Sequence, residues 1–262
     1  MKKLFFALMI GTIMVACTAK TDNPFFQSYE NEFGAPPFDK IKTEHYMPAF
    51  TEGMKQHQAE IDSIANNTEA PTFANTIEKM DFSGELLKKV SSAFFNVQSA
   101  DTNDDLDSIA KEITPELTAH NDNIYLNDKL FQRVKTLYDN RTNLGLTAEQ
   151  NRLLEKYYKN FIRSGAALNE TQKAGLREIN KELSSAELNF AQNVLAETNA
   201  YQKFVTSKDE LKGLPEGVIQ AAAEGAKEAG KEGQWLFTTQ KSSFIPVLQY
   251  GENRELRKEL LM

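Results

Sequence analysis

The sequence predicts an all-α protein built mainly from long antiparallel amphipathic helices. Three observations predict this class. Residues 146–214 contain two successive cap-and-stripe patterns of the kind that begins and continues a helix. The rest of the chain is a succession of helical segments with modest polar links. Only residues 234–239 have the aromatic and β-branched content of a strand.

The first helix of the central pair begins after Thr147, a favourable N-cap, and Gln150 completes a capping box three residues later. Apolar residues follow at helical spacing, and we expect the helix to end near residues 164–165. These apolar residues are Leu153, Leu154, Tyr157, Tyr158, Phe161 and Ile162.

The second helix of the pair begins after Asn169, with Gln172 at the same offset. Its apolar stripe is spaced by threes and fours, and Lys, Arg and Glu fill the opposite face. The stripe consists of Leu176, Ile179, Leu183, Ala186, Phe190 and Val194. Two long helices with a short link predict an antiparallel pair in a larger helical body.

The N-terminus predicts export. Lys2 and Lys3 precede a short apolar run, which is typical of a signal peptide over residues 1–16 and is too short to span a membrane. Cys17, the single cysteine, follows Ala16 as in a bacterial lipoprotein box, so we predict lipidation at Cys17 and a polar tether over 17–22. The alternative is a soluble periplasmic protein cleaved near Ala16. Any membrane contact is expected only through Cys17.

The segment after the tether combines an extended backbone with helices. Prolines in residues 33–38 exclude a helix there, and we expect the four aromatic residues of this region to anchor the segment across the helical body. These residues are Phe25, Phe26, Phe33 and Phe38. Thr43 then begins a helix that reaches about residue 66.

The remaining elements follow in order. Thr72 caps a predicted helix over 73–100 that contains Gly84, at a cost of about 1 kcal/mol relative to alanine. Helices are expected near 106–120, 128–140 and 215–231. A strand over 234–239 carries Trp235, which we assign to core packing, with a cleft-lining role as the alternative.

Composition excludes some partners. Acidic residues outnumber basic ones by 37 to 30, so the net charge of −7 argues against a nucleic-acid backbone as ligand. The acidic residues of 101–107 lack the glycine and closing glutamate of a calcium loop. Residues 225–231 resemble a phosphate loop, but Glu232 follows where a hydroxyl is required, and we reject nucleotide binding.

No catalytic residue and no metal ligand can be named. A zinc peptidase motif needs two histidines four residues apart on one helix face, with a glutamate beside the first. His45, His57 and His120 are the only histidines, and none begins such a motif. We expect them to face solvent or to form hydrogen bonds. The G-x-S-x-G pattern of serine hydrolases is also absent.

Four stretches of the sequence resemble the thimet oligopeptidase family of zinc metallopeptidases, which includes bacterial peptidyl-dipeptidases and oligopeptidase A. They are PPFDKIKTEHYMPAF, RLLEKYYKNFIRSGAAL, INKELSSAELNFAQNVL and KDELKGLPEGVI. Together they are spread over most of the chain after residue 23.

The resemblance implies a parent enzyme with two mostly helical lobes around a deep channel. Residues 23–205 would form the N-terminal helical lobe, and residues 206–262 would begin the catalytic lobe, truncated here. Zinc would be bound in the full-length parent, by ligands outside this chain. We therefore expect short peptides as substrates, the missing catalytic lobe as a partner, a monomer, and no activity from these residues alone. The alternative is a non-catalytic helical lipoprotein that binds peptides or a protein. Peptide preference, and endopeptidase against dipeptidyl cleavage, stay open.

Overall fold

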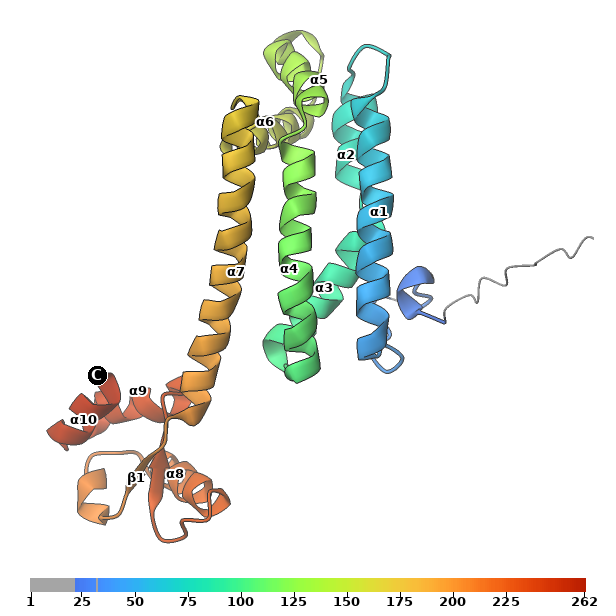
Figure 1. The fold of residues 1–262 in the computed structure, drawn as a ribbon. Helices are drawn as coiled ribbons and strands as arrows, with labels where there is room; N and C mark the ends of the chain where they lie inside the picture. Colours follow the sequence, from blue (N-terminus) through green and yellow to red (C-terminus); the bar gives the residue numbers. More distant parts are fainter. Residues whose placement is uncertain (1–21, 32) are drawn as a thin grey trace, which may run out of the picture. The chain divides into compact units, whose positions relative to one another are not determined.

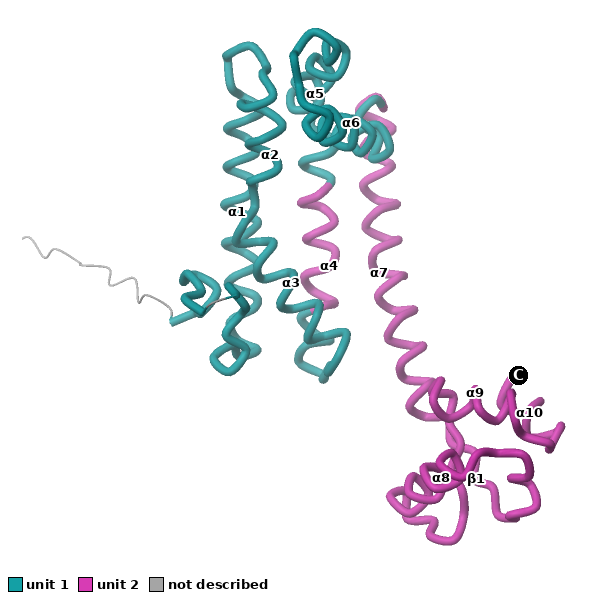
Figure 2. The backbone as a smooth tube through the Cα atoms, turned by 180° about the vertical axis from the view of Figure 1, so that it is seen from behind, with its two compact units in different colours: residues 1–109, 122–167 teal, residues 110–121, 168–262 magenta. Residues whose placement is uncertain are grey.

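The computed structural model describes residues 22–31 and 33–262. These residues divide into two compact units (Figure 2). Unit 1 comprises the residues up to 109 together with 122–167, and unit 2 comprises 110–121 together with 168–262. The predicted signal peptide, Cys17 and nearly all of the tether lie outside the described residues, so export and lipidation stay predictions.

The all-α prediction is confirmed, since the described residues form helices apart from one two-stranded sheet (Figure 1). The helices of the first part of the chain are α1 (Tyr46–Ala65), α2 (Lys79–Phe82), α3 (Glu85–Ala100), α4 (Asp104–Tyr125), α5 (Asp128–Asp139) and α6 (Ala148–Arg163). The later elements are α7 (Glu170–Ala200), β1 (Lys203–Val205), α8 (Glu216–Glu228), β2 (Trp235–Phe237), α9 (Lys241–Tyr250) and α10 (Arg254–Leu261). Within the described residues, no helix is both long and apolar enough to cross a bilayer.

An aromatic cluster joins the N-terminal segment to α1 and α3 in unit 1. Phe25 is buried against Tyr46, with ring centroids 5.5 Å apart, and Tyr46 meets Phe94 edge to face at 5.0 Å. Edge-to-face contacts of this kind add to the free energy of burying the rings. The cluster fixes the start of α1 against α3.

The prediction of four aromatic anchors is correct only for Phe25. Phe26, Phe33 and Phe38 are 42%, 87% and 51% exposed. The physical reason at Phe33 is local. Asn31 closes a tight turn with Ala35 through two hydrogen bonds of 2.6 and 2.8 Å. The side chain of Asn31 thus satisfies both backbone groups of Ala35, and Phe33 is left exposed.

A second core in unit 1 lies where α1, α5 and α6 meet. Ile61, Leu130, Leu154 and Phe161 are fully buried there, and Phe161 stacks with Phe131 at 5.8 Å. The capping box predicted for α6 is present, because Thr147 Oγ1 accepts from the Gln150 backbone N–H at 3.2 Å. Two residues of the apolar stripe predicted for α6 are buried, and both belong to this core: Leu154 and Phe161.

The predicted single helix over 73–100 is wrong in its middle. A π-helical turn (Phe73–Glu78) leads into α2. The helix is interrupted at Ser83 and Gly84, and α3 then begins. Gly84 has φ +71°, and its backbone N–H donates to Glu60 Oε2 at 2.7 Å. A helical residue would donate that N–H to the preceding turn, so the carboxylate of Glu60 and the left-handed glycine together end α2.

Unit 2 places a small sheet among short helices. The strand predicted over 234–239 is present as β2, and it pairs antiparallel with β1, which the sequence did not indicate; Phe204 lies opposite Leu236. Val205, Leu211, Phe237 and Val247 are buried in the core beneath the sheet. Trp235 packs against this core, in agreement with the core-packing assignment.

Helix α7 has the predicted cap. Asn169 Oδ1 accepts from the Gln172 backbone N–H at 3.0 Å, which begins the helix as expected. The rest of unit 2 leaves the apolar stripe of α7 largely exposed: Ile179 is 60% and Phe190 71% exposed. The predicted antiparallel pairing of α6 with α7 stays a prediction, because the two helices belong to different units.

The units also divide the chain at a point other than the predicted one. Unit 1 ends at residue 167, whereas the lobe boundary was expected between residues 205 and 206. The predicted boundary concerns the lobes of a larger parent protein, and in that sense it stays a prediction.

Candidate functional site

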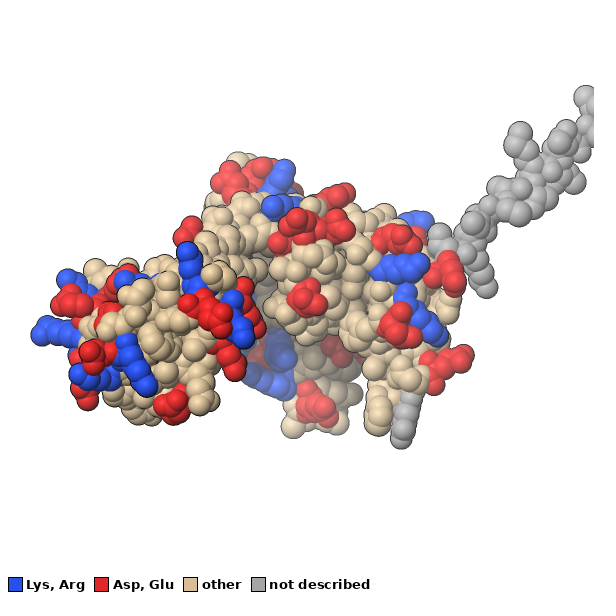
Figure 3. Space-filling model, turned by 90° about the horizontal axis from the view of Figure 1, so that it is seen from below, with Lys and Arg blue, Asp and Glu red and all other residues tan. Residues whose placement is uncertain are grey.

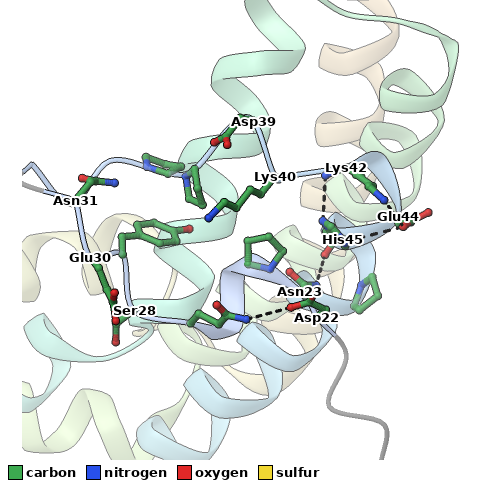
Figure 4. Close-up of a pocket in the computed structure, with 16 residues that line it drawn as sticks. Asp22, Asn23, Ser28, Glu30, Asn31, Asp39, Lys40, Lys42, Glu44 and His45 are labelled. Atoms are coloured by element: carbon green, nitrogen blue, oxygen red, sulfur yellow. Dashed lines mark hydrogen bonds and ion pairs between the residues drawn. The ribbon is translucent and has the colours of Figure 1, made fainter.

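A hollow of about 1440 Å³ lies between the N-terminal segment and the start of α1 in unit 1 (Figure 4). The turns around residues 28–31 and 36–42 form its rim. Charged residues of both signs line it: Asp22, Glu30, Asp39, Lys40, Lys42 and Glu44. Such a lining suits a ligand that itself carries both charges and hydrogen-bonding groups, as a short peptide does.

Asn23 fixes one wall of this hollow to α1. Its side chain is buried; Oδ1 accepts from the Phe25 backbone N–H at 3.0 Å, and Nδ2 donates to the carbonyl oxygen of His45 at 2.8 Å. The same side chain therefore caps the short 3₁₀ helix Pro24–Phe26 and attaches it to the residue that precedes α1.

His45 is part of the backbone architecture of the hollow. Its Nδ1 accepts from the Lys42 backbone N–H at 3.0 Å, so the neutral ring carries its proton on Nε2. That nitrogen lies 4.0 Å from the carboxylate of Glu44 (Figure 4). With Nδ1 occupied as an acceptor, His45 supports the turn before α1 and is poorly placed to act as a free base.

His57 and Ser83 lie close together, but their hydrogen bonds do not make a catalytic pair. His57 Nε2 is 3.1 Å from Ser83 Oγ, and Ser83 Oγ donates to the carbonyl oxygen of Met80 at 2.7 Å. Because the hydroxyl proton is used in that bond, His57 is the donor to Ser83 and cannot accept the proton of a nucleophile. Ser83 is also buried. We interpret the hydrogen bonds of His57 and Ser83 as part of the structure that ends α2.

His120 is the third histidine, and it is buried in α4, where burial lowers the pKa of the imidazole. The prediction that these histidines are exposed or hydrogen-bonded is correct for His45 and His57. Among residues 22–31 and 33–262, no group of three or more His, Cys, Asp or Glu side chains could hold a metal ion. The structure therefore assigns no metal ligand within its described part.

Surface charge does not gather into a basic field on the face shown in Figure 3, where Lys and Arg alternate with Asp and Glu. In α1, Lys55 likewise pairs with Glu52 at 3.5 Å. A phosphate backbone requires clustered cations. This face does not provide them.

The role of Asn23 can be tested by two substitutions. Asn23→Ala removes both hydrogen bonds, and we expect a loss of about 1–2 kcal/mol in the local stability of residues 22–50. Asn23→Asp keeps an acceptor for the Phe25 N–H but loses the donor to His45, so its loss should be intermediate. Hydrogen exchange of the start of α1 measures both. Equal exchange in the wild type and Asn23→Ala would contradict this role.

The chain is similar in sequence to curated bacterial peptidases. It is 38% identical over 242 residues to the dipeptidyl carboxypeptidase of Escherichia coli and 37% identical over 238 residues to that of Salmonella typhimurium; these alignments cover 92% and 91% of this chain. Oligopeptidase A of Salmonella typhimurium is 26% identical over 238 residues. No family model matches the chain.

Over its matched residues, the chain belongs to the dipeptidyl carboxypeptidase and oligopeptidase A family. The resemblance inferred from the four sequence stretches is thereby confirmed. The chain spans about a third of the length of these relatives: 36% of the first and 35% of the second.

Sequence reasoning missed the residues that shape the hollow. Asn23 was given no role beyond the boundary of the tether, although an Asn directly before Pro24 is a recognisable capping signal. The position of His45 Nδ1 opposite a backbone N–H three residues earlier has no comparable sequence signal, because it depends on the dihedral angles of the turn.

Proposed function

We propose that this chain supplies the N-terminal helical lobe of an exported, zinc-dependent peptidase that hydrolyses short peptides and releases dipeptides from their C-termini. The identity of 38% to a dipeptidyl carboxypeptidase over 92% of the chain carries the proposal. In this function the lobe is a binding and positioning element. Its helices would form one wall of the space that a peptide enters.

The described residues do not fit a zinc site, so we derive no hydrolytic step from them. His45 and His57 use ring nitrogens in bonds to Lys42 N–H and Ser83 Oγ, and no cluster of His, Cys, Asp or Glu within the described ranges offers a third ligand. A catalytic zinc ion needs three protein ligands and an open position for water. In this proposal these ligands come from polypeptide beyond this chain.

The proposal predicts that the chain alone is inactive. We expect no release of dipeptides from an N-blocked tetrapeptide, with or without added zinc, as measured by mass spectrometry. Supplying the remaining two-thirds of the Escherichia coli dipeptidyl carboxypeptidase as a separate chain should produce zinc-dependent release. Metal-dependent cleavage by this chain alone would contradict the assignment of the chemistry to other polypeptide.

A second function, a non-catalytic lipoprotein that binds peptides, is favoured by the charged hollow of about 1440 Å³ beside α1. Calorimetry with short zwitterionic peptides tests it. The mass of the native protein separates the two functions. A catalytic parent should be roughly 2.6 times as large as this 29.6 kDa chain, because 242 matched residues are only 36% of the relative.

A further inference from the structure

Helix α7 carries an apolar surface that the rest of unit 2 leaves uncovered. We define the α7 stripe as Ile179, Leu183, Ala186, Phe190 and Val194. Ile179, Leu183, Phe190 and Val194 are 60%, 53%, 71% and 48% exposed. The steps of four, three, four and four residues keep all five on one side of a continuous helix of 31 residues (Figure 1).

A stripe of this kind is a strong candidate for an interface. At a rise of about 1.5 Å per residue it runs for about 22 Å along the helix. Burying each large side chain fully is worth about 1.5–3 kcal/mol. Contiguous apolar surface of this extent on a soluble protein marks a contact with another polypeptide or segment.

The flanks of the stripe argue against a second copy of this chain. Between residues 178 and 197, α7 carries Glu178, Glu182, Glu187 and Glu197 but a single lysine, Lys181. In a parallel two-stranded coil, Glu182 of one copy would face Glu187 of the other, and charges at these flanking positions decide which helices pair. The regular three–four alternation also ends at Phe190, well short of the three to four heptads of a stable coil.

The glutamates beside the α7 stripe indicate what kind of surface could bind it. A shallow hollow of about 440 Å³ lies on α7 beside the small residues Ser185 and Ala186, and two glutamates and one lysine also line it: Glu178, Glu182 and Lys181. An apolar side chain could fill the space above Ala186 while a lysine or arginine beside it meets the glutamates. The complementary surface is therefore an apolar stripe with basic edges.

The relatives supply a candidate for that surface. The chain is matched over 92% of its length, yet this match covers only 36% of the Escherichia coli dipeptidyl carboxypeptidase. A protein of that length has about two-thirds of its polypeptide available to cover α7 from within the same molecule.

We propose that the α7 stripe is the seam along which the remaining two-thirds of this peptidase docks, through an apolar surface edged by lysine or arginine. This inference rests on the proposed function, since it assigns the partner to the same enzyme. It makes α7 the element that holds the two parts in register, a role separate from peptide binding and from the chemistry.

The test mixes this chain with the remaining two-thirds of the Escherichia coli dipeptidyl carboxypeptidase, expressed as a separate polypeptide. We expect a one-to-one complex in sedimentation, and at least tenfold slower hydrogen exchange over residues 179–194. Leu183→Glu places a charge in the seam and should weaken the complex by about 100-fold or more. Ala174→Glu adds the same charge to an exposed position of α7 that lies outside both the stripe and the hollow, and it should change affinity by less than about threefold.

Leu183 and Phe190 are exposed within unit 2, so Leu183→Glu and Phe190→Glu should keep the wild-type circular dichroism. The proposal is overturned if the wild-type chain does not bind the Escherichia coli polypeptide, or if the stripe gains no protection from hydrogen exchange in the complex. It is also overturned if both variants bind that polypeptide as tightly as the wild type does. Concentration-dependent self-association that both variants abolish would assign the stripe to a second copy and would also overturn the proposal.

Dipeptide release separates the two proposals. A complex without hydrolysis contradicts the proposed function alone, and hydrolysis that survives both variants contradicts the seam alone.

Discussion

Replacing Gly213 by alanine should destabilise unit 2 by about 3 kcal/mol or more. Gly213 has φ +87°, and a Cβ atom added there would lie 2.2 Å from the carbonyl oxygen of Tyr250. Because that oxygen belongs to the backbone, no side-chain rotation can relieve the overlap. The turn over 211–214 would have to separate from residues 250–252, breaking the hydrogen bond of 2.9 Å from the Glu252 N–H to the Lys212 carbonyl oxygen.

Gly233→Ala is the matched control in the same unit. Its φ of +86° is nearly the same, but a Cβ atom there has no neighbour within 4 Å, so only the left-handed backbone penalty of about 1–2 kcal/mol applies. Trp235, the single tryptophan, lies in β2 and makes fluorescence a probe of unit 2 during urea unfolding. Equal losses in the two variants would show that the approach of Tyr250 has no energetic consequence.

Removing the guanidinium of Arg133 should destabilise unit 1 by about 3 kcal/mol. Arg133 is only 7% exposed. Its Nη1 donates to the carbonyl oxygens of Asn67 and Glu69 at 2.8 and 3.0 Å, and its Nη2 donates to Asn75 Oδ1 at 2.9 Å. One side chain from α5 thus holds the link that follows α1 and the first turn after it. Arg133→Ala leaves all three acceptors without this donor.

Two further variants separate charge from geometry. Arg133→Lys keeps the positive charge but cannot reach three acceptors with a planar fork, so it should lose about 1–2 kcal/mol. Lys129→Ala removes an exposed bond of 2.8 Å to Asn66 from the same helix, and its loss should stay below about 0.5 kcal/mol. Hydrogen exchange over residues 66–78 gives a local measurement. Exchange that rises equally in Lys129→Ala and Arg133→Ala would contradict the assigned role.

Sequence reasoning succeeded where the determining interactions are local. Thr147 with Gln150, and Asn169 with Gln172, begin their helices as predicted, because a cap involves only residues three apart. The strand around Trp235 was recognised from its own composition. Its partner β1 was not, because Lys203 to Val205 is too short for a pattern and is selected by pairing with residues some thirty positions away.

The features that sequence reasoning missed have one cause in common: a sequence pattern does not show which residues an element packs against. Spacing located the α7 stripe correctly but could not tell whether this chain covers it. Gly84 was tolerated inside a helix because the sequence does not show that Glu60, from α1, captures its N–H. The same holds for the candidate site, where Asn23 and His45 meet across 22 positions.

Helix α4 affects how this molecule can be dissected. Its ends, before residue 110 and after residue 121, belong to unit 1, whereas 110–121 belong to unit 2, so one uninterrupted helix is shared by both. The polypeptide passes between the units three times. A truncation at residue 167 would therefore leave a central stretch of α4 without the rest of its unit, and a polypeptide beginning at 168 would lack part of its own. Cleavage of the single peptide bond at 167–168 need not release either half.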